Sequence, residues 1–236
     1  MKVKNMSIFL EVLAQAESRL KQMSQQMENI RWMAENDRYD AALEQALRLE
    51  YNSEKLTLLT RALPGYTGNP LAKAHVEKAI REAVPVEVGY TAEGWFSLRL
   101  PLLLPKKSQG SADYIRGCLY PAMRRFFQDK PPVRYPDCVL IFRHVYSRDR
   151  PERQWRDHDN LEVNIVSDIV ALYTLPDDSP GVCNHFYCSA AGDKERTEVY
   201  VVPKDDFQKW LAVEKSMSGD GVALSKNCGI QSEKHM

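Results

Sequence analysis

The periodicity of the apolar residues changes at Pro85, and this change limits the chain to a fold that joins a helical part to a part containing strands. Before Pro85 the apolar residues recur every three or four positions, which is typical of amphipathic helices. After Pro85, short runs rich in Val, Phe, Leu and Tyr are bounded by turn residues, which is typical of strands. Helical patterns separate some of these runs without strict alternation, so we expect an α+β fold.

Three regions follow from this pattern. We expect an N-terminal helical region over residues 1–83, an α+β domain over residues 84–214 and a disordered tail over residues 215–236, which is rich in Ser, Gly, Lys and Asn. The helical region contains an apolar seam with alternating steps of four and three: Phe9, Leu13, Ala16, Leu20, Met23, Met27 and Ile30. This seam indicates either a helical hairpin or a dimeric coiled coil. The hairpin is favoured, because only about three heptads are sustained.

The α+β domain is expected to contain strands, turns and helices in a definite order. The segments "VEVGY" and "WFSLRLPLLL" are predicted strands around a turn at 91–94, and "DCVLIFRHVYS" is a predicted interior strand. The segment 182–203 is a predicted hairpin around "GDKE". Helices are expected over 111–130, where Pro121 marks a kink or the true start, over 161–175 and over 204–215.

Composition and charge exclude several classes of protein. The 236 residues are 44% hydrophobic and 27% charged, as in ordinary globular proteins. The formal net charge is zero, so any contact with nucleic acid must come from a local basic patch. No apolar run is long enough to span a bilayer. The five cysteines are scattered and no signal peptide is evident, so we expect a cytoplasmic protein with reduced thiols.

Two aspartates, Asp157 and Asp159, lie one residue apart where an arginine-rich loop meets the helix expected from about Leu161. In an extended segment, residues two apart point to the same side. Asp178 follows the end of that helix, and it joins the pair if the chain folds back. Three carboxylates, together with water and phosphate oxygens, suit magnesium or manganese.

The same residues also fit ordinary helix capping. Asp159 and Glu162 have the spacing of a capping box, in which Asp159 is the N-cap and Glu162 reaches back to its amide. The segment "DDSPG" that contains Asp178 is common turn chemistry. Asp157 is the residue that capping leaves unexplained, so both interpretations stay open.

The loop before the acidic pair carries candidate phosphate-binding arginines: Arg148, Arg150, Arg153 and Arg156. Lys106 and Lys107 precede them in the sequence. Arginines beside carboxylates suit a site where a metal and a phosphodiester meet. The alternative is an exposed loop whose arginines pair with local acids.

Two further groups of residues have the side chains of a metal or acid–base site. Cys183, His185 and Cys188 suggest zinc, but on a strand Cys188 points away from the other two, so a strand with buried cysteines is favoured. His144 and His158 flank the arginine loop, where they either assist acid–base chemistry or are simply solvated.

The segment "RDHDNLEVNIVSDIV...LPDD", with the strand before it and the predicted hairpin after it, resembles the RusA-type Holliday-junction resolvases. The resemblance covers roughly residues 95–203 and implies a homodimer that hydrolyses branched DNA with magnesium. Asp157 and Asp159 match the acids of the family's Asp-x-Asp-Asn motif, Asn160 matches its asparagine, and Asp178 matches its later acid. The family's catalytic lysine, one helical turn into the motif helix, is replaced here by Val163.

Two hypotheses follow. The first is a divergent Mg²⁺- or Mn²⁺-dependent endonuclease in which Asp157, Asp159 and Asp178 hold the metal while arginines of the loop contact phosphates. The second is a catalytically inactive module of the same fold that binds nucleic acid or protein, with the N-terminal helices recruiting a partner. Val163 and the zero net charge favour the second hypothesis.

Overall fold

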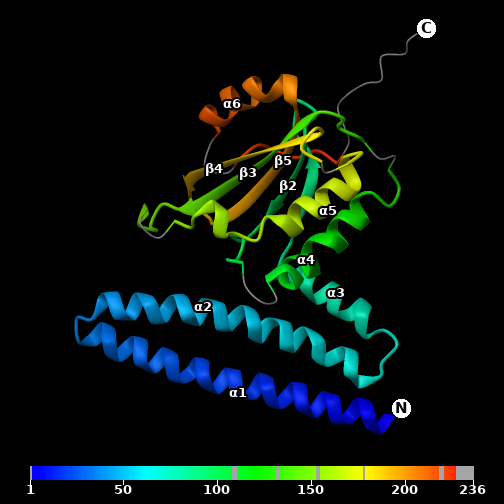
Figure 1. Ribbon diagram of the computed structural model, residues 1–236. Coiled ribbons are helices and arrows are strands. Elements are labelled where there is room, and N and C mark those ends of the chain that lie inside the picture. Colours follow the sequence, from blue (N-terminus) through cyan, green and yellow to red (C-terminus); the bar gives the residue numbers. More distant parts are fainter. Residues whose placement is uncertain are drawn as a thin grey trace. The chain divides into compact units, whose positions relative to one another are not determined.

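The computed structural model describes residues 2–107, 111–130, 133–152, 155–177, 179–217 and 221–226. The chain divides into two compact units, Met1–Ala79 and Ile80–Met236. The first unit is helical and the second combines helices with a mixed sheet, as Figure 1 shows. The α+β class expected from the sequence is therefore confirmed.

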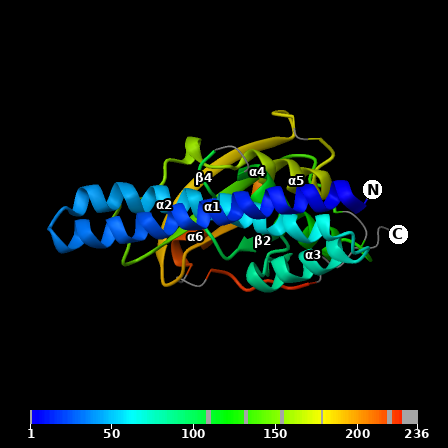
Figure 2. The same ribbon diagram turned by 90° about the horizontal axis from the view of Figure 1, so that it is seen from below.

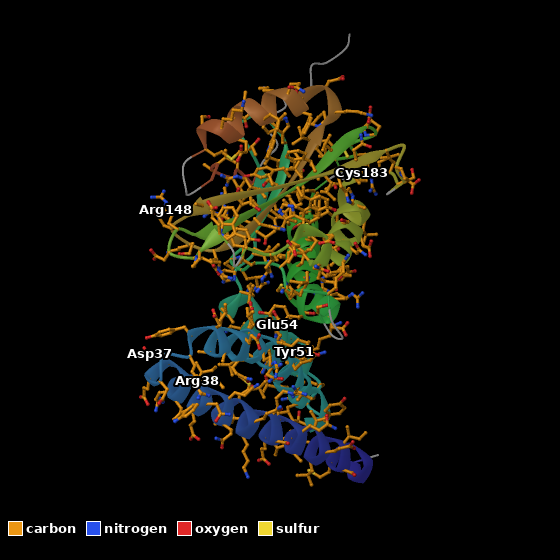
Figure 3. The ribbon with its side chains drawn as sticks, turned by 60° about the vertical axis from the view of Figure 1, so that its left-hand side comes forward. Asp37, Arg38, Tyr51, Glu54, Arg148 and Cys183 are labelled. Carbon is orange, nitrogen blue, oxygen red and sulfur yellow. The ribbon has the colours of Figure 1, made fainter. Side chains whose placement is uncertain are left out.

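The first unit is built around a helical hairpin, which confirms the favoured interpretation of the apolar seam. Figures 1 and 2 both show its two long helices side by side. At the turn between them, which Figure 3 labels, Asp37 has a φ of 59°, a left-handed conformation that short polar residues tolerate. The helical elements that begin in this unit are α1 (Lys2–Glu35), α2 (Tyr39–Ala62), η1 (Leu63–Thr67) and α3 (Ala72–Ala83).

The side of α1 that packs against α2 follows the predicted seam in part, since Phe9, Leu13, Ala16, Met23 and Ile30 are buried or half-buried. Leu20 and Met27 are 53% and 49% exposed, although the seam placed both at the contact. Instead, Asn52 of α2 is buried, accepts a hydrogen bond from Arg19 Nη1 and donates one to Gln26 Oε1, both at 2.8 Å. A buried polar layer of this kind fixes the register between two helices. An apolar spacing alone could not reveal it.

The second unit contains a five-stranded sheet with the order β1-β2-β5-β3-β4. The pair β3–β4 is parallel and the other neighbouring pairs are antiparallel. Helices α4 and α5 cover one face, and α6 covers the other (Figure 1). The bounds are β1 (Glu87–Tyr90), β2 (Phe96–Leu100), α4 (Ser111–Phe126), β3 (Cys138–Ser147), η3 (His158–Asn160), α5 (Asn164–Thr174), β4 (Cys183–Gly192), β5 (Arg196–Pro203), η4 (Lys204–Asp206) and α6 (Phe207–Ser216).

The predicted hairpin over 182–203 is wrong. β4 and β5 are consecutive in the chain, but β3 lies between them in the sheet. The connection at 193–195 therefore joins β4 to a strand two places away. β3, α5 and β4 instead form a parallel crossover unit, in which α5 returns the chain to the starting end of β3. A short Gly-containing connection has the same appearance in sequence whether or not its strands pair.

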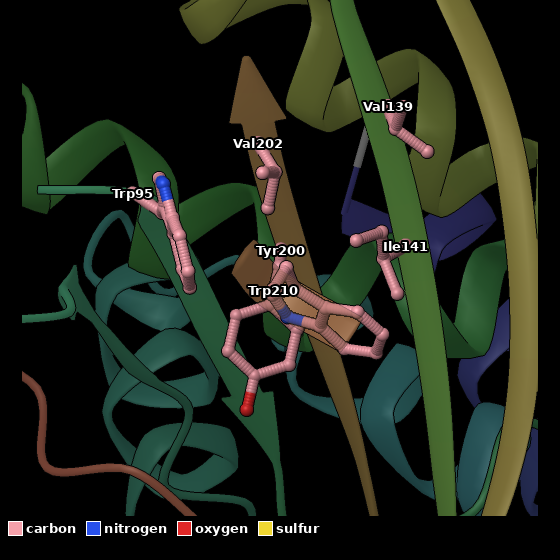
Figure 4. Close-up of a cluster of buried hydrophobic side chains, with 6 residues drawn as sticks. All are labelled: Trp95, Val139, Ile141, Tyr200, Val202 and Trp210. Atoms are coloured by element: carbon pink, nitrogen blue, oxygen red, sulfur yellow. The ribbon is translucent and has the colours of Figure 1, made fainter. Parts of the chain in front are cut away.

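Successive side chains along each strand point to opposite faces of the sheet, and each face packs against different helices. Val139 and Ile141 of β3, with Tyr200 and Val202 of β5, point toward α6 and pack with Trp210, which is fully buried (Figure 4). The residues between them, two apart on each strand, point toward α4 and α5. This alternation decides which side chains of β3 and β4 can meet on the α5 side of the sheet.

Residues 221–226 run beside the first strand. Tyr90 and Ser225 exchange two backbone hydrogen bonds of 2.8 Å, and Arg99 Nη2 donates to the carbonyl oxygen of Val222 at 2.8 Å. This segment lies within the range 215–236 that composition assigns to the tail, and α6 extends to Ser216. Among the helices that the structure describes, none carries an apolar stretch able to cross a membrane.

Candidate functional site

The loop after β3 returns to the sheet through a stacked aromatic pair. Trp155 stacks on Tyr146 with ring centroids 4.7 Å apart and an interplanar angle of 8°. The backbone N–H of Arg156 donates to Tyr146 Oη at 3.0 Å, and Arg156 Nη1 donates to the carbonyl oxygen of Leu104. These contacts fix the residue before the acidic pair and bring the pair to the carboxyl end of β3.

Asp157 and Asp159 lie in one tight turn. Asp157 has an extended backbone (φ −67°, ψ 132°), and the next three residues form the 3₁₀ turn η3. The segment is therefore not extended throughout, unlike the geometry expected from the sequence. Both side chains are exposed, and within the described parts of the chain neither carboxylate has a hydrogen-bond or ion-pair partner.

Lys107 supplies a positive charge beside this turn. Its backbone N–H donates to the carbonyl oxygen of Asn160 at 2.7 Å, and its Nζ donates to the carbonyl oxygen of Asp159 at 3.0 Å. The adjacent residue, Lys106, forms a β-bridge with Leu161. Lys107 and Asp159 are 52 positions apart in the chain. Sequence reasoning grouped Lys107 with the local cations, but no spacing rule could have linked it to this turn.

The helix after the turn begins later than expected. α5 starts at Asn164, and its N-cap is Val163, which has no side chain able to cap and is only 5% exposed. The proposed capping box is wrong, because Glu162 instead accepts a hydrogen bond from Ser111 Oγ at 2.6 Å. The bridge at Leu161 holds this segment extended, which delays the helix. Asp157 and Asp159 are therefore not explained as caps of α5.

The third predicted ligand, Asp178, lies outside the described residues. Its neighbour Asp177 follows α5, whose last residue, Thr174, accepts a backbone hydrogen bond from Tyr135, three positions before β3. The acidic pair lies near the opposite end of β3, and an eleven-residue helix is about 16 Å long. In the residues that the structure describes, no three His, Cys, Asp or Glu side chains are grouped to hold a metal ion.

The predicted phosphate-binding arginines differ in their surroundings. Arg150 pairs with Glu195 through two hydrogen bonds of 2.5 and 3.1 Å. Arg148 is more exposed and lies 3.6 Å from the carboxylate of Asp193. Burial of the Arg156 guanidinium lowers its pKa, and its contact with a backbone carbonyl leaves it little access to a ligand. Arg153 lies outside the described residues.

Two histidines meet on the α5 side of the sheet near the acidic turn. His158 lies 3.0 Å from Ser189 Oγ through its Nε2, and its ring stacks on Tyr187 of β4. The His144 ring is 5.3 Å from the His158 ring and is fully buried. Burial, with a smaller contribution from His158, lowers the pKa of His144 to about 4. His144 is therefore neutral at physiological pH, and His158 is the histidine that remains accessible.

Comparisons with known proteins add a family but no activity. A family model whose description is "Family of unknown function (DUF6100)" matches residues 4–227. The matched range includes both the helical hairpin and the α+β unit. Searches of curated proteins and of solved structures found no match.

Proposed function

The chain belongs to the DUF6100 family of unknown function, and we propose that it is a metal-dependent endonuclease of branched DNA, similar to the RusA-type resolvases. One observation carries the proposal. A single turn presents two exposed carboxylates, Asp157 and Asp159, which have no partner among the described residues, and Lys107 Nζ donates to the backbone carbonyl of the same turn. Carboxylates that bind a divalent ion next to a cation that binds phosphate are the groups that phosphodiester hydrolysis requires.

The acidic pair fits the coordination habits of magnesium. Magnesium keeps several waters and is commonly held by one or two carboxylates together with phosphate oxygens, so a complete cage of protein ligands is not required. Asp157 and Asp159 supply these two carboxylates, and both are exposed. Asp178 is the third candidate ligand. A bound Mg²⁺ or Mn²⁺ would supply Lewis-acid polarisation of the phosphodiester.

Lys107 takes the role of the catalytic lysine of the RusA-type resolvases, at whose position this chain has the uncharged Val163. Negative charge increases on the phosphate oxygens in the transition state, and a fixed cation stabilises this charge more than it stabilises the ground state. Lys107 Nζ is held against the turn by its hydrogen bond to Asp159. Among the described arginines of the loop, Arg148, with its exposed side chain, is the one best able to contact a neighbouring phosphate.

Cleavage of a labelled synthetic four-way junction tests the proposal. The wild-type protein should cut the junction with Mg²⁺ or Mn²⁺, stop when EDTA is added, and leave a linear duplex of the same sequence intact. Lys107→Ala should lower the cleavage rate at saturating protein by about 100-fold, which is the effect of removing one donor to a developing oxyanion.

Matched variants identify the groups responsible. Lys106→Ala removes a neighbouring exposed lysine that contacts the turn through its backbone, and it should leave the rate within about twofold, as expected for a surface charge. Asp178→Asn separates a two-carboxylate site from a three-carboxylate site. Wild-type protein that leaves the junction intact with either metal contradicts the nuclease proposal, whatever the variants do.

The second candidate is the catalytically inactive module. It is favoured by the buried, uncharged Val163 and by the exposed apolar side chains Leu20, Met27 and Trp32 on α1, which could contact a partner protein or a second copy. Retarded but intact junction DNA, with an affinity that falls steeply with salt, would support a binding module. A homodimer remains part of both proposals.

A further inference from the structure

Two cysteines face each other at the first position of neighbouring parallel strands. Cys138 of β3 and Cys183 of β4 are register partners, and both side chains are buried, with 0% and 7% exposure. Figure 3 shows Cys183 at the opposite end of the β3–β4 pair from Arg148. Neighbouring strands lie about 4.8 Å apart, and disulfides join residues whose Cα atoms are about 4.4–6.8 Å apart. The backbone therefore already permits an S–S bond here.

The surroundings of the two sulfur atoms differ. Cys183 Sγ lies 3.7 Å from the carbonyl oxygen of Asn184, and Cys138 is its register partner on the neighbouring strand. His185 is the next residue on the same face of β4, and its Nδ1 lies 3.2 Å from Tyr187 Oη. Cys183, His185 and Tyr187 thus lie in a row on one face of β4. Hydrogen bonds donated to a sulfur favour its thiolate form.

These neighbours affect the two sulfur atoms differently. The interaction with Cys138 lowers the pKa of Cys183; burial opposes this effect, and His185 adds to it. The interaction with Cys183, together with burial, raises the pKa of Cys138. Of the two, Cys183 is therefore the cysteine whose surroundings favour the thiolate.

We propose that Cys183 is a peroxide-reactive cysteine and that Cys138 converts its oxidised form into a disulfide between β3 and β4. The juxtaposition that carries the inference is a buried pair of cysteines in register on neighbouring strands, with His185 the next residue on the same face of β4. This modification site lies beyond the proposed nuclease activity and does not depend on it.

The oxidant is hydrogen peroxide, and the reaction has two steps. The Cys183 thiolate attacks one peroxide oxygen, so that an S–O bond forms, the O–O bond breaks, and hydroxide leaves. Cys183 is then a sulfenic acid. The Cys138 sulfur attacks the sulfenic sulfur, so that the S–S bond forms and the S–O bond breaks. The leaving hydroxide takes the Cys138 proton and departs as water. One peroxide thus oxidises two thiols.

The other described cysteines serve as internal references. Cys188 lies on the α6 side of β4, is more exposed than Cys183, and has a pKa raised to about 12, chiefly by burial. Cys118 is buried and donates a hydrogen bond to the carbonyl oxygen of Ile115 at 3.2 Å. Neither residue has a cysteine as its register partner among the described strands. Exposure alone would make Cys188 more reactive than Cys183.

The test begins with the unmodified full-length protein. At neutral pH, iodoacetamide should alkylate Cys183 at least about tenfold faster than Cys188, because the thiolate is the reacting form. One equivalent of hydrogen peroxide should produce a peptide linked through Cys138 and Cys183 that dithiothreitol separates. In Cys138→Ser, peroxide should leave Cys183 as a sulfenic acid that dimedone captures, and in His185→Ala the alkylation of Cys183 should slow.

The results overturn the proposal in either of two cases. The first is alkylation of Cys183 in the wild-type chain that is no faster than alkylation of Cys188, a measurement that needs no folded variant. The second is peroxide oxidation without a Cys138–Cys183 linkage. Cys118→Ser should leave both the alkylation rate and the linkage unchanged, so a loss of the linkage in that variant also counts against the proposal.

Discussion

Replacing Asp159 with asparagine should lower the rate of junction cleavage by on the order of 10³-fold, which corresponds to about 4 kcal/mol of transition-state stabilisation. Asparagine keeps the shape of the side chain but loses the charge that a divalent ion requires from its ligand. The substitution should not disturb the fold. The Asp159 carboxylate is exposed and has no partner among the described residues, and Lys107 binds its backbone oxygen, which the variant retains.

The matched control is Asp168→Asn. Asp168 is an exposed carboxylate on α5, so the same chemical change is made outside the acidic turn. Its cleavage rate should stay within about twofold of the wild-type rate, as for other surface substitutions. Circular dichroism of both variants should match the wild type. A folded Asp159→Asn protein that cleaves as fast as Asp168→Asn would remove Asp159 from the metal site.

Replacing Glu198 with alanine should lower the free energy of unfolding by about 3–5 kcal/mol, because it leaves buried arginine charge without its counter-ion. Glu198 is 1% exposed and accepts hydrogen bonds from Arg196 Nε at 2.7 Å, Arg143 Nη1 at 3.1 Å and Tyr200 Oη at 2.7 Å. Arg143 is itself 3% exposed and keeps one further acid, Glu214. Urea unfolding at neutral pH, followed by tryptophan fluorescence, measures the loss.

The pH dependence gives the same prediction an independent check. Burial alone would raise the pKa of Glu198, but the hydrogen bond from Tyr200 and the charge of Arg143 lower it below its usual 4.5. The stabilisation is therefore complete above pH 4.5 and is lost as the pH falls below that value. The control is Glu195→Ala, whose half-exposed pair with Arg150 should contribute about 1 kcal/mol or less. Equal losses in the two variants would contradict the prediction.

Local patterns predicted most of the elements, because each depends on residues close together in the chain. The β1–β2 hairpin around its turn, the helix α4 with Pro121 inside it and the interior strand β3 all follow from periodicity and breaker residues. The pairing of β5 with β3 did not, because a short connection does not reveal whether its strands are neighbours in the sheet. The buried polar contact of Asn52 with Arg19 and Gln26 was also missed, since it depends on residues of both helices.

The candidate site also has parts that follow from local sequence and parts that depend on contacts between residues far apart in the chain. The neighbouring positions of Asp157 and Asp159 are a local feature, and the sequence predicted their presence in one loop. Lys107 contacts that loop only through the fold, by way of the bridge between Lys106 and Leu161. The helix start was misjudged for the same reason, because this bridge extends the segment before Asn164. Contacts of long sequence separation therefore account for the part of the site that sequence reasoning missed.

The most direct test of the metal site is Mn²⁺ binding, followed by electron paramagnetic resonance on the full-length protein without DNA. The proposal predicts one Mn²⁺ per chain, competed by Mg²⁺, and loss of this binding when Asp157 and Asp159 are both replaced by asparagine, while Asp168→Asn binds as the wild type does. Binding of the same stoichiometry and affinity in the doubly substituted protein would contradict the proposal that these two carboxylates hold the ion.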